Sequence, residues 1–169
     1  RGVRARALAT VIVFSNTTPF IALASTGQIE LLPRLFNAIH VADAVIEECA
    51  EGGRIAVPDL RRLPWVVQAG EMSGAIQPVL MELDGGEKQT IALAMAHGPQ
   101  ADLVIMDERL GRRIAEYVGL KVTGTLGVLA KAKSIGLIPS FRAAADALRD
   151  EGIYYSAELI ARLADHLGE

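Results

Sequence analysis

The residues best suited to chemistry in this chain are carboxylates at the ends of predicted strands and helices. Asp107 is the clearest case, because the apolar run LVIM (103–106) leads directly into it and the arginine-bearing segment 108–113 follows. This pattern predicts a buried strand that delivers a carboxylate to its C-terminal end, where open α/β sheets keep their active sites. An aspartate after a strand is also a common N-cap of the next helix, so capping is the alternative role.

A second polar strand end lies near the N-terminus. The run VIVF (11–14) leads into Ser15 and Asn16, and a helix is expected from Thr18. The Asn16 side chain can cap a turn, coordinate a metal ion through its amide oxygen, or do both, and without companion ligands the turn is favoured. If the sheet is parallel, the polar ends of both strands open on the same edge.

Two glutamates on predicted helices are further candidates. Glu87 follows Asp84 by three residues, a spacing typical of a capping box in which the glutamate reaches back to the helix start. In the helix predicted after Asp43, a rotation of about 100° per residue places Glu47 almost opposite the apolar face and Glu48 at its flank. We therefore expect Glu48 to point along the sheet edge toward a cleft and Glu47 to be solvated.

Basic and hydroxyl side chains near Asp107 are candidates for contact with phosphate. Arg109, Arg112 and Arg113 lie on the helix predicted after Asp107, and one or two of them could hold a phosphate group. The alternative is a solvated face whose arginines pair with neighbouring glutamates. Thr125 follows the last predicted strand, where it either caps a helix or supports the site indirectly. We take Arg109, Arg112 and Thr125 as the substrate-binding candidates.

The elements that would position these residues alternate along the chain. Strands are predicted at 11–15, 38–42, 65–68, 103–106 and 120–123, with helical segments between them and three more helices after residue 125. This alternation predicts a three-layer α/β/α fold with a mostly parallel central sheet and a helical C-terminal tail at 125–169. We expect a single domain at 11–169 after a flexible segment at 1–10, for which a phosphate-contacting arm is the alternative.

Composition narrows the class of protein. The chain has 169 residues, of which 51% are hydrophobic and 22% charged, as in globular domains. Aromatic residues are only 5%, which argues against the base-stacking platforms of RNA-reading modules, and a net charge of −3 means that nucleic acid must be met locally. The lone Cys49 excludes a cysteine-based zinc cluster and fits a reducing cytoplasm. No apolar run approaches the ~18 residues of a membrane helix, so we expect a cytoplasmic protein.

Several segments together resemble the PIN-domain superfamily. They are SNTTPFIAL, VADAVIEE, LDGGEKQTIALA, LVIMDERLGRR and VTGTLGVL, and the stretch TGTLGVLAKAKSIGLIPS is the most specific portion. The resemblance covers roughly residues 11 to 130 and is closest to a PIN-like group of prokaryotic proteins related to VapC-type toxins. Each motif is weak alone, whereas their order and spacing together make a fairly strong match.

The resemblance implies a small α/β/α nuclease fold whose carboxylates hold Mg²⁺ or Mn²⁺ for phosphodiester hydrolysis. The metal-binding positions of the family then fall on Asn16, Glu48, Glu87 and Asp107, and the last three are the catalytic candidates. Asn16 departs from the family pattern, since these nucleases generally carry Asp there, and its amide brings no charge. Mg²⁺ keeps several waters and needs few carboxylates, and one of those waters supplies the nucleophile. Without a cation, crowding three carboxylates would raise at least one pKa.

Three functions compete on this evidence. We expect a metal-dependent ribonuclease, the toxin of a toxin–antitoxin pair, with RNA and an antitoxin protein as partners and a homodimer as its assembly. The alternative is a catalytically weak or inactive PIN-like module that binds RNA or a protein, favoured by Asn16 and by the acidic balance. A nucleotide-binding Rossmann protein ranks third, because neither G-x-G-x-x-G nor G-x-x-x-x-G-K-[ST] occurs.

Overall fold

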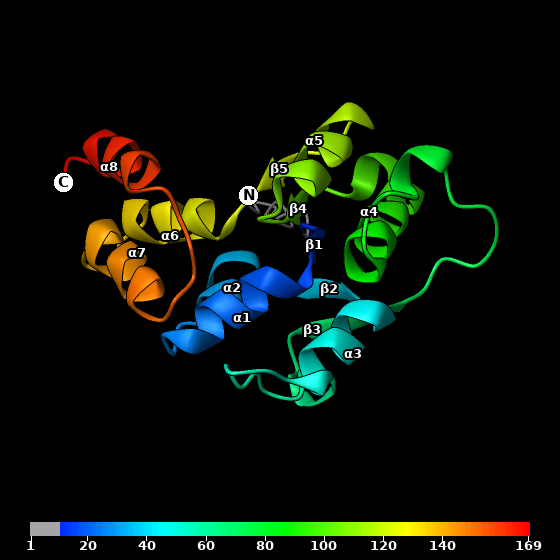
Figure 1. Cartoon of the computed structure of the whole chain (residues 1–169), viewed down its shortest axis with the longest axis horizontal. Coiled ribbons are helices and arrows are strands. Elements are labelled where there is room, and N and C mark those ends of the chain that lie inside the picture. Colours follow the sequence, from blue (N-terminus) through cyan, green and yellow to red (C-terminus); the bar gives the residue numbers. More distant parts are fainter. Residues whose placement is uncertain (1–10) are drawn as a thin grey trace, which may run out of the picture.

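The computed structural model describes residues 11–169 (Figure 1), so the flexible segment expected at 1–10 lies outside the described residues. The strands are β1 (Val13–Ser15), β2 (Ile39–Ala42), β3 (Val66–Gly70), β4 (Leu103–Ile105) and β5 (Val122–Thr123). The helices are α1 (Thr17–Ser25), α2 (Leu31–Phe36), α3 (Asp43–Glu51), α4 (Gly85–His97), α5 (Arg109–Tyr117), α6 (Thr125–Ser134), α7 (Phe141–Asp150) and α8 (Ala157–His166). Three short 3-10 helices lie at Leu60–Arg62, Pro78–Leu80 and Gly98–Gln100.

The five strands form one parallel sheet in the order β3-β2-β1-β4-β5. Right-handed crossovers place α1 and α3 on one face and α4 and α5 on the other (Figure 1). Because both faces are covered, the central strands β1 and β4 are built mainly from apolar residues, and Phe14 and Ile105 are completely buried. The predicted α/β architecture with a parallel sheet and C-terminal helices is therefore confirmed.

The helix that carries Glu87 begins and ends for local reasons. The Asp84 carboxylate accepts a hydrogen bond of 2.8 Å from the Glu87 backbone N–H, which makes Asp84 the N-cap of α4. The helix ends at Gly98, whose φ of +59° lies in the left-handed region that favours glycine. Ahead of α4, the residues Pro78–Leu80 form a single 3-10 turn, in which the Leu80 N–H donates to the Gln77 carbonyl at 3.0 Å.

The helical tail packs against α1 and α2, and its first helix, α6, also contacts β5. Helix α6 contacts α7, α8 and α2, and α1 contacts both α6 and α7. The N-termini of α7 and α8 are capped by the hydroxyls of Ser140 and Ser156. Between these two helices, a linker returns toward the centre of the molecule (Figure 1). In the part of the chain that the structure describes, no helix combines the length and the apolar character needed to cross a membrane.

Candidate active site

The candidate residues gather where the direction of strand order reverses. From β1 the chain continues to β2 on one side of the sheet, whereas β4 continues to β5 on the other, so the C-terminal ends of these two neighbours border the crevice in which α/β proteins bind ligands. Asn16 follows β1 directly, and its backbone N–H donates to the Ile105 carbonyl at 3.0 Å. Asp107 follows two residues after the end of β4. As expected for a parallel sheet, Asn16 and Asp107 follow strands that end at the same edge.

Glu48 points into this edge from α3. One carboxylate oxygen accepts from the Thr17 hydroxyl and the other accepts from the Gly86 backbone N–H at 3.0 Å. Glu48 is half-buried while Glu47 is exposed, as helical periodicity predicts. A Cβ at Gly86 would lie only 2.6 Å from a Glu48 oxygen, so the glycine is what allows the carboxylate to approach the start of α4.

Glu87 is buried and lacks the partner that the capping-box spacing predicts. Its side chain is 6% exposed, and among residues 11–169 Oε1 has no hydrogen-bond partner. Asp84 caps the helix, but the Glu87 carboxylate does not reach back, so only half of the box forms. Burial, followed by the charges of Asp84 and Glu108, raises the pKa of Glu87 to about 7. A buried oxygen without a partner costs free energy, which indicates a partner from outside the chain.

Asn16 shares this property. It is 3% exposed, and its buried Oδ1 atom has no hydrogen-bond partner in the described part of the chain. Although Asn16 occupies the N-cap position of α1, its side chain makes no capping bond there. The turn-capping alternative is therefore not observed. Asn16 and Glu87 thus present two unpartnered acceptor oxygens, and hard cations such as Mg²⁺ are bound by oxygen ligands of this kind.

Asp107 has a different environment. Its Oδ1 accepts from the Thr125 N–H at 2.7 Å, and its Oδ2 accepts from the Thr125 hydroxyl at 2.7 Å and from the Tyr155 hydroxyl at 2.9 Å. Asp107 does not cap the following helix, because the N-cap of α5 is Glu108, whose side chain makes no capping bond. Thr125 likewise supports Asp107 instead of capping α6 with its own side chain.

Tyr155 was missed by the sequence reasoning. It lies 48 residues after Asp107, in the linker between α7 and α8. Burial, together with the neighbouring Asp107 charge, raises the pKa of its hydroxyl above the ordinary value, so the group donates as a neutral phenol. The sequence signal that points to this segment is the adjacent pair Tyr154 and Tyr155 in a chain with few aromatic residues.

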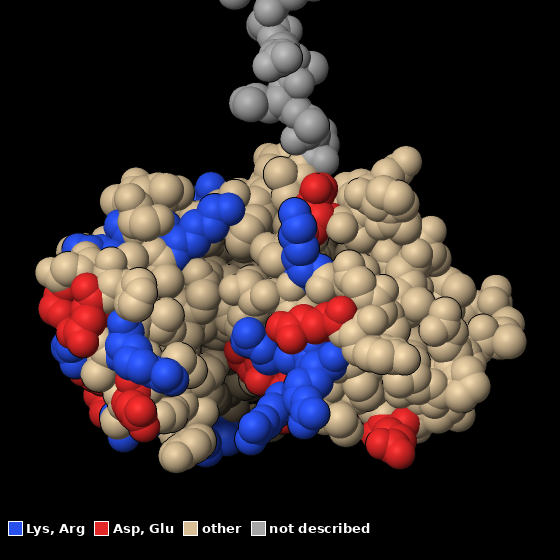
Figure 2. Space-filling view, turned by 90° about the horizontal axis from the view of Figure 1, so that it is seen from above, with Lys and Arg blue, Asp and Glu red and all other residues tan. Residues whose placement is uncertain are grey.

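The arginines of α5 divide into one inward and two outward side chains. Arg112 is half-buried, and its Nη1 donates to the Met106 carbonyl at 3.4 Å, whereas Arg109 and Arg113 are exposed. Between residues 11 and 169, none of the three forms an ion pair, so the predicted pairing with glutamates is not observed. Figure 2 shows Lys and Arg side chains gathered among acidic ones on one face, beside a hollow in the surface.

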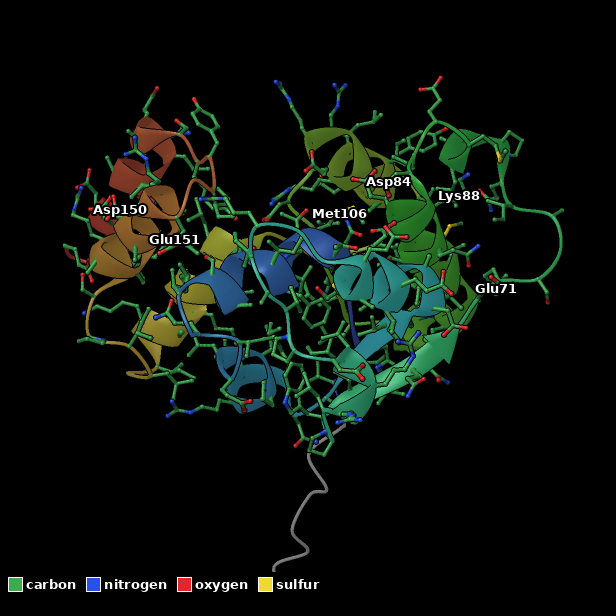
Figure 3. All side chains as sticks on the ribbon, turned by 60° about the horizontal axis from the view of Figure 1, so that its bottom comes forward. Glu71, Asp84, Lys88, Met106, Asp150 and Glu151 are labelled. Atoms are coloured by element: carbon green, nitrogen blue, oxygen red, sulfur yellow. The ribbon has the colours of Figure 1, made fainter. Side chains whose placement is uncertain are left out.

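Glycines make room for all three carboxylates. Besides Gly86, a Cβ at Gly111 would lie 2.9 Å from Glu87 Oε1, and a Cβ at Gly124 would lie 2.8 Å from Asp107 Oδ1 and 2.5 Å from Arg112 Nη1. Figure 3 shows Asp84 and Met106 near the part of the sheet edge where α3, α4 and α5 meet. The backbone is thus shaped to bring charged groups close at this edge.

The four candidate residues do not form a preformed metal-binding site in the described structure. Over the described range 11–169, no group of three or more His, Cys, Asp or Glu side chains is placed to hold a metal ion. Glu48 and Glu87 are close enough for the charge of Glu48 to contribute to the raised pKa of Glu87, whereas Asp107 is engaged by donors from α6 and the tail. Coordination of one ion by Asn16, Glu48, Glu87 and Asp107 together stays a prediction.

Comparison with known families agrees with this arrangement. A family model, DUF3368, described as a PIN domain, matches residues 12–169. Searches of curated proteins and of solved structures found no match. Because the match covers nearly the whole chain, this protein belongs to the PIN domain family, whose members are typically metal-dependent nucleases.

Proposed function

We propose that this chain is a Mg²⁺- or Mn²⁺-dependent endoribonuclease that acts as the toxin of a toxin–antitoxin pair. The observation that carries the proposal is the pair of buried, unpartnered acceptor oxygens on Asn16 and Glu87 at the switch point of a PIN-family sheet. Buried oxygens in proteins are rarely left without a hydrogen-bond partner. A divalent cation such as Mg²⁺, which prefers oxygen ligands, would be a suitable partner for these two.

The side chains present divide the work between them. Asn16 Oδ1 and the carboxylates of Glu87 and Glu48 would hold the ion, and Asp107 would complete its surroundings. When bound, the ion supplies a water of lowered pKa and stabilises charge on the phosphate. The Thr17 hydroxyl and the Gly86 N–H orient Glu48. Arg112, which lines the same cavity as Asp107, would hold a non-bridging phosphate oxygen.

The partners follow from the same proposal. RNA is the substrate, an antitoxin protein is the inhibitor, and a homodimer is the proposed assembly. With a formal net charge of −3, the chain offers RNA no overall attraction, so the basic side chains near Asp107 must provide the local contacts.

The decisive test is cleavage of single-stranded RNA by the full chain in Mn²⁺ and in EDTA. We expect metal-dependent cleavage that falls at least about a hundredfold in Glu87→Gln and in Glu48→Gln, because each loses a charged ligand. Glu47→Gln is the matched control, since Glu47 is adjacent in sequence but exposed, and it should cleave like the wild type. If neither the wild type nor Asn16→Asp cleaves any of a broad set of RNAs, the enzyme proposal fails.

A non-catalytic PIN-like module is the second candidate, and two observations favour it. Asn16 replaces a charged ligand with a neutral one, and the Asp107 oxygens are already occupied by Thr125 and Tyr155. Under this reading, RNA or a protein binds equally well in EDTA and in Mn²⁺ without cleavage. Asn16→Asp would then add repulsion beside other carboxylates and lower stability without creating activity.

A further inference from the structure

We propose that a cavity beside Asp107 binds one unpaired nucleobase of a single-stranded nucleic acid, a proposal that rests on the nuclease function and names the part of the substrate it recognises. The cavity has a volume of about 250 Å³. It lies between α5, β5, α6, the linker after α7, and α8. Its lining includes Asp107, Arg112, Leu126, Tyr155, Leu159 and Leu163.

The walls of the cavity have the two kinds of chemistry that a nucleobase needs. Three leucines, Leu126, Leu159 and Leu163, form an apolar part, while Asp107 and Arg112 stand at the polar part. Unpaired bases are held by stacking on aromatic rings or guanidinium planes and by hydrogen bonds to their edges. Tyr155 brings an aromatic ring to the lining of the cavity and Arg112 brings a guanidinium group, so a flat ligand with a polar edge suits it.

The size of the cavity limits the ligand. Pockets for drug-sized molecules have volumes of roughly 300 to 1,000 Å³, so about 250 Å³ suits a single base and not a longer stretch of chain. A single-base cavity is also compatible with the low aromatic content, because it needs one ring where a stacking platform needs several. Recognition therefore depends on one extruded base.

The position of the cavity ties it to the cleavage site. Asp107 and Arg112 border it, so a base bound there would belong to a nucleotide next to the phosphate held by Arg112. Tyr155 is kept at the wall by its 2.9 Å hydrogen bond to Asp107. In Figure 2 the surface is hollowed between the helical tail and the rest of the molecule. The tail thus contributes specificity to a reaction centred on the sheet.

Binding of mononucleotides in EDTA tests the cavity without cleavage. Calorimetry on the full chain would compare the four ribonucleoside 5′-monophosphates and their deoxy forms with ribose 5-phosphate, which lacks a base. We expect at least one nucleotide to bind ten times more tightly than ribose 5-phosphate. Leu159→Asp, at a residue 37% exposed and therefore tolerant of substitution, should remove that advantage. Ile135→Asp, at an exposed apolar residue outside the cavity, should retain it.

Arg112→Gln provides a second variant, because Arg112 makes only one long hydrogen bond and its loss should not prevent folding. Because Arg112 is assigned to the phosphate, this variant should weaken nucleotides and ribose 5-phosphate alike, by at least fivefold, and keep the preference for a base. Equal affinity of nucleotides and ribose 5-phosphate in the wild type, or an unchanged preference for a base in Leu159→Asp, would overturn the proposal. RNA cleavage is scored separately. If the chain cleaves RNA but prefers no base, the nuclease function stands and base binding in the cavity is overturned. If it binds a base but cleaves no RNA, base binding stands and the nuclease function is overturned.

Discussion

Glu87 and Asp107 lie at the same edge of the sheet but meet opposite environments. Glu87 is buried by the start of α4 with an unpartnered oxygen and a pKa raised to about 7. Asp107 accepts three hydrogen bonds from Thr125 and Tyr155. The difference separates two uses of a carboxylate. The Glu87 carboxylate is buried with one oxygen unpartnered, at a cost in stability, and the Asp107 carboxylate joins the sheet to the helical tail.

The largest expected effect on stability comes from replacing Asp107, the carboxylate that accepts three hydrogen bonds. Asp107→Ala should lower the free energy of unfolding by about 3 kcal/mol, because it removes three charge-assisted hydrogen bonds and leaves buried donors of Thr125 unpaired. Urea denaturation measures it. Glu108→Ala, at the exposed neighbour, is the control and should change little. A loss below about 1 kcal/mol would mean that the contacts to Asp107 do not join the tail to the sheet.

A divalent metal ion should stabilise the protein through Glu87, the carboxylate with an unpartnered oxygen. Mn²⁺ at a hundredfold excess over its Kd should stabilise the wild type by about 2.7 kcal/mol, since it binds only the folded state. Glu87→Gln should lose most of this gain, which thermal unfolding with and without Mn²⁺ measures. Glu47→Gln is the control. An equal shift in the wild type and in Glu87→Gln would place the ion elsewhere.

The pKa of Glu87 predicts a pH-dependent effect. Its folded-state pKa of about 7 lies above the ordinary 4.5, so its contribution to stability is present below pH 4.5 and is lost as the pH rises through 7. Without metal, Glu87→Gln should therefore be more stable than the wild type at pH 8 and equal to it at pH 4. Denaturation at both pH values checks this. A variant that is less stable at pH 8 would show that the carboxylate is favourably paired.

The smallest effect concerns Tyr155. Tyr155→Phe removes one hydrogen bond to Asp107 and should cost about 1 kcal/mol of unfolding free energy. Tyr154→Phe is a matched control, because Tyr154 is adjacent in sequence and almost fully exposed. Denaturant midpoints of the two variants give the comparison. Equal midpoints would leave Thr125 as the partner that matters for Asp107.

Features that depend on nearby residues could be predicted from the sequence. The alternation of strands and helices, the polar residues at strand ends, and the choice of Glu48 over Glu47 all follow from hydrophobic periodicity, which is a local property. The segments that resemble the PIN superfamily agree with the family match over residues 12–169. The local sequence around each residue is enough to predict these features.

The partners of the candidate residues were decided only by the tertiary structure. The spacing of Asp84 and Glu87 predicts a reciprocal cap, but burial leaves the Glu87 carboxylate without its partner. Asp107 binds Thr125 and Tyr155, which lie 18 and 48 residues away, instead of capping the helix beside it. Such contacts depend on how β4, α6 and the tail pack, and packing between distant segments leaves no periodic pattern in the sequence.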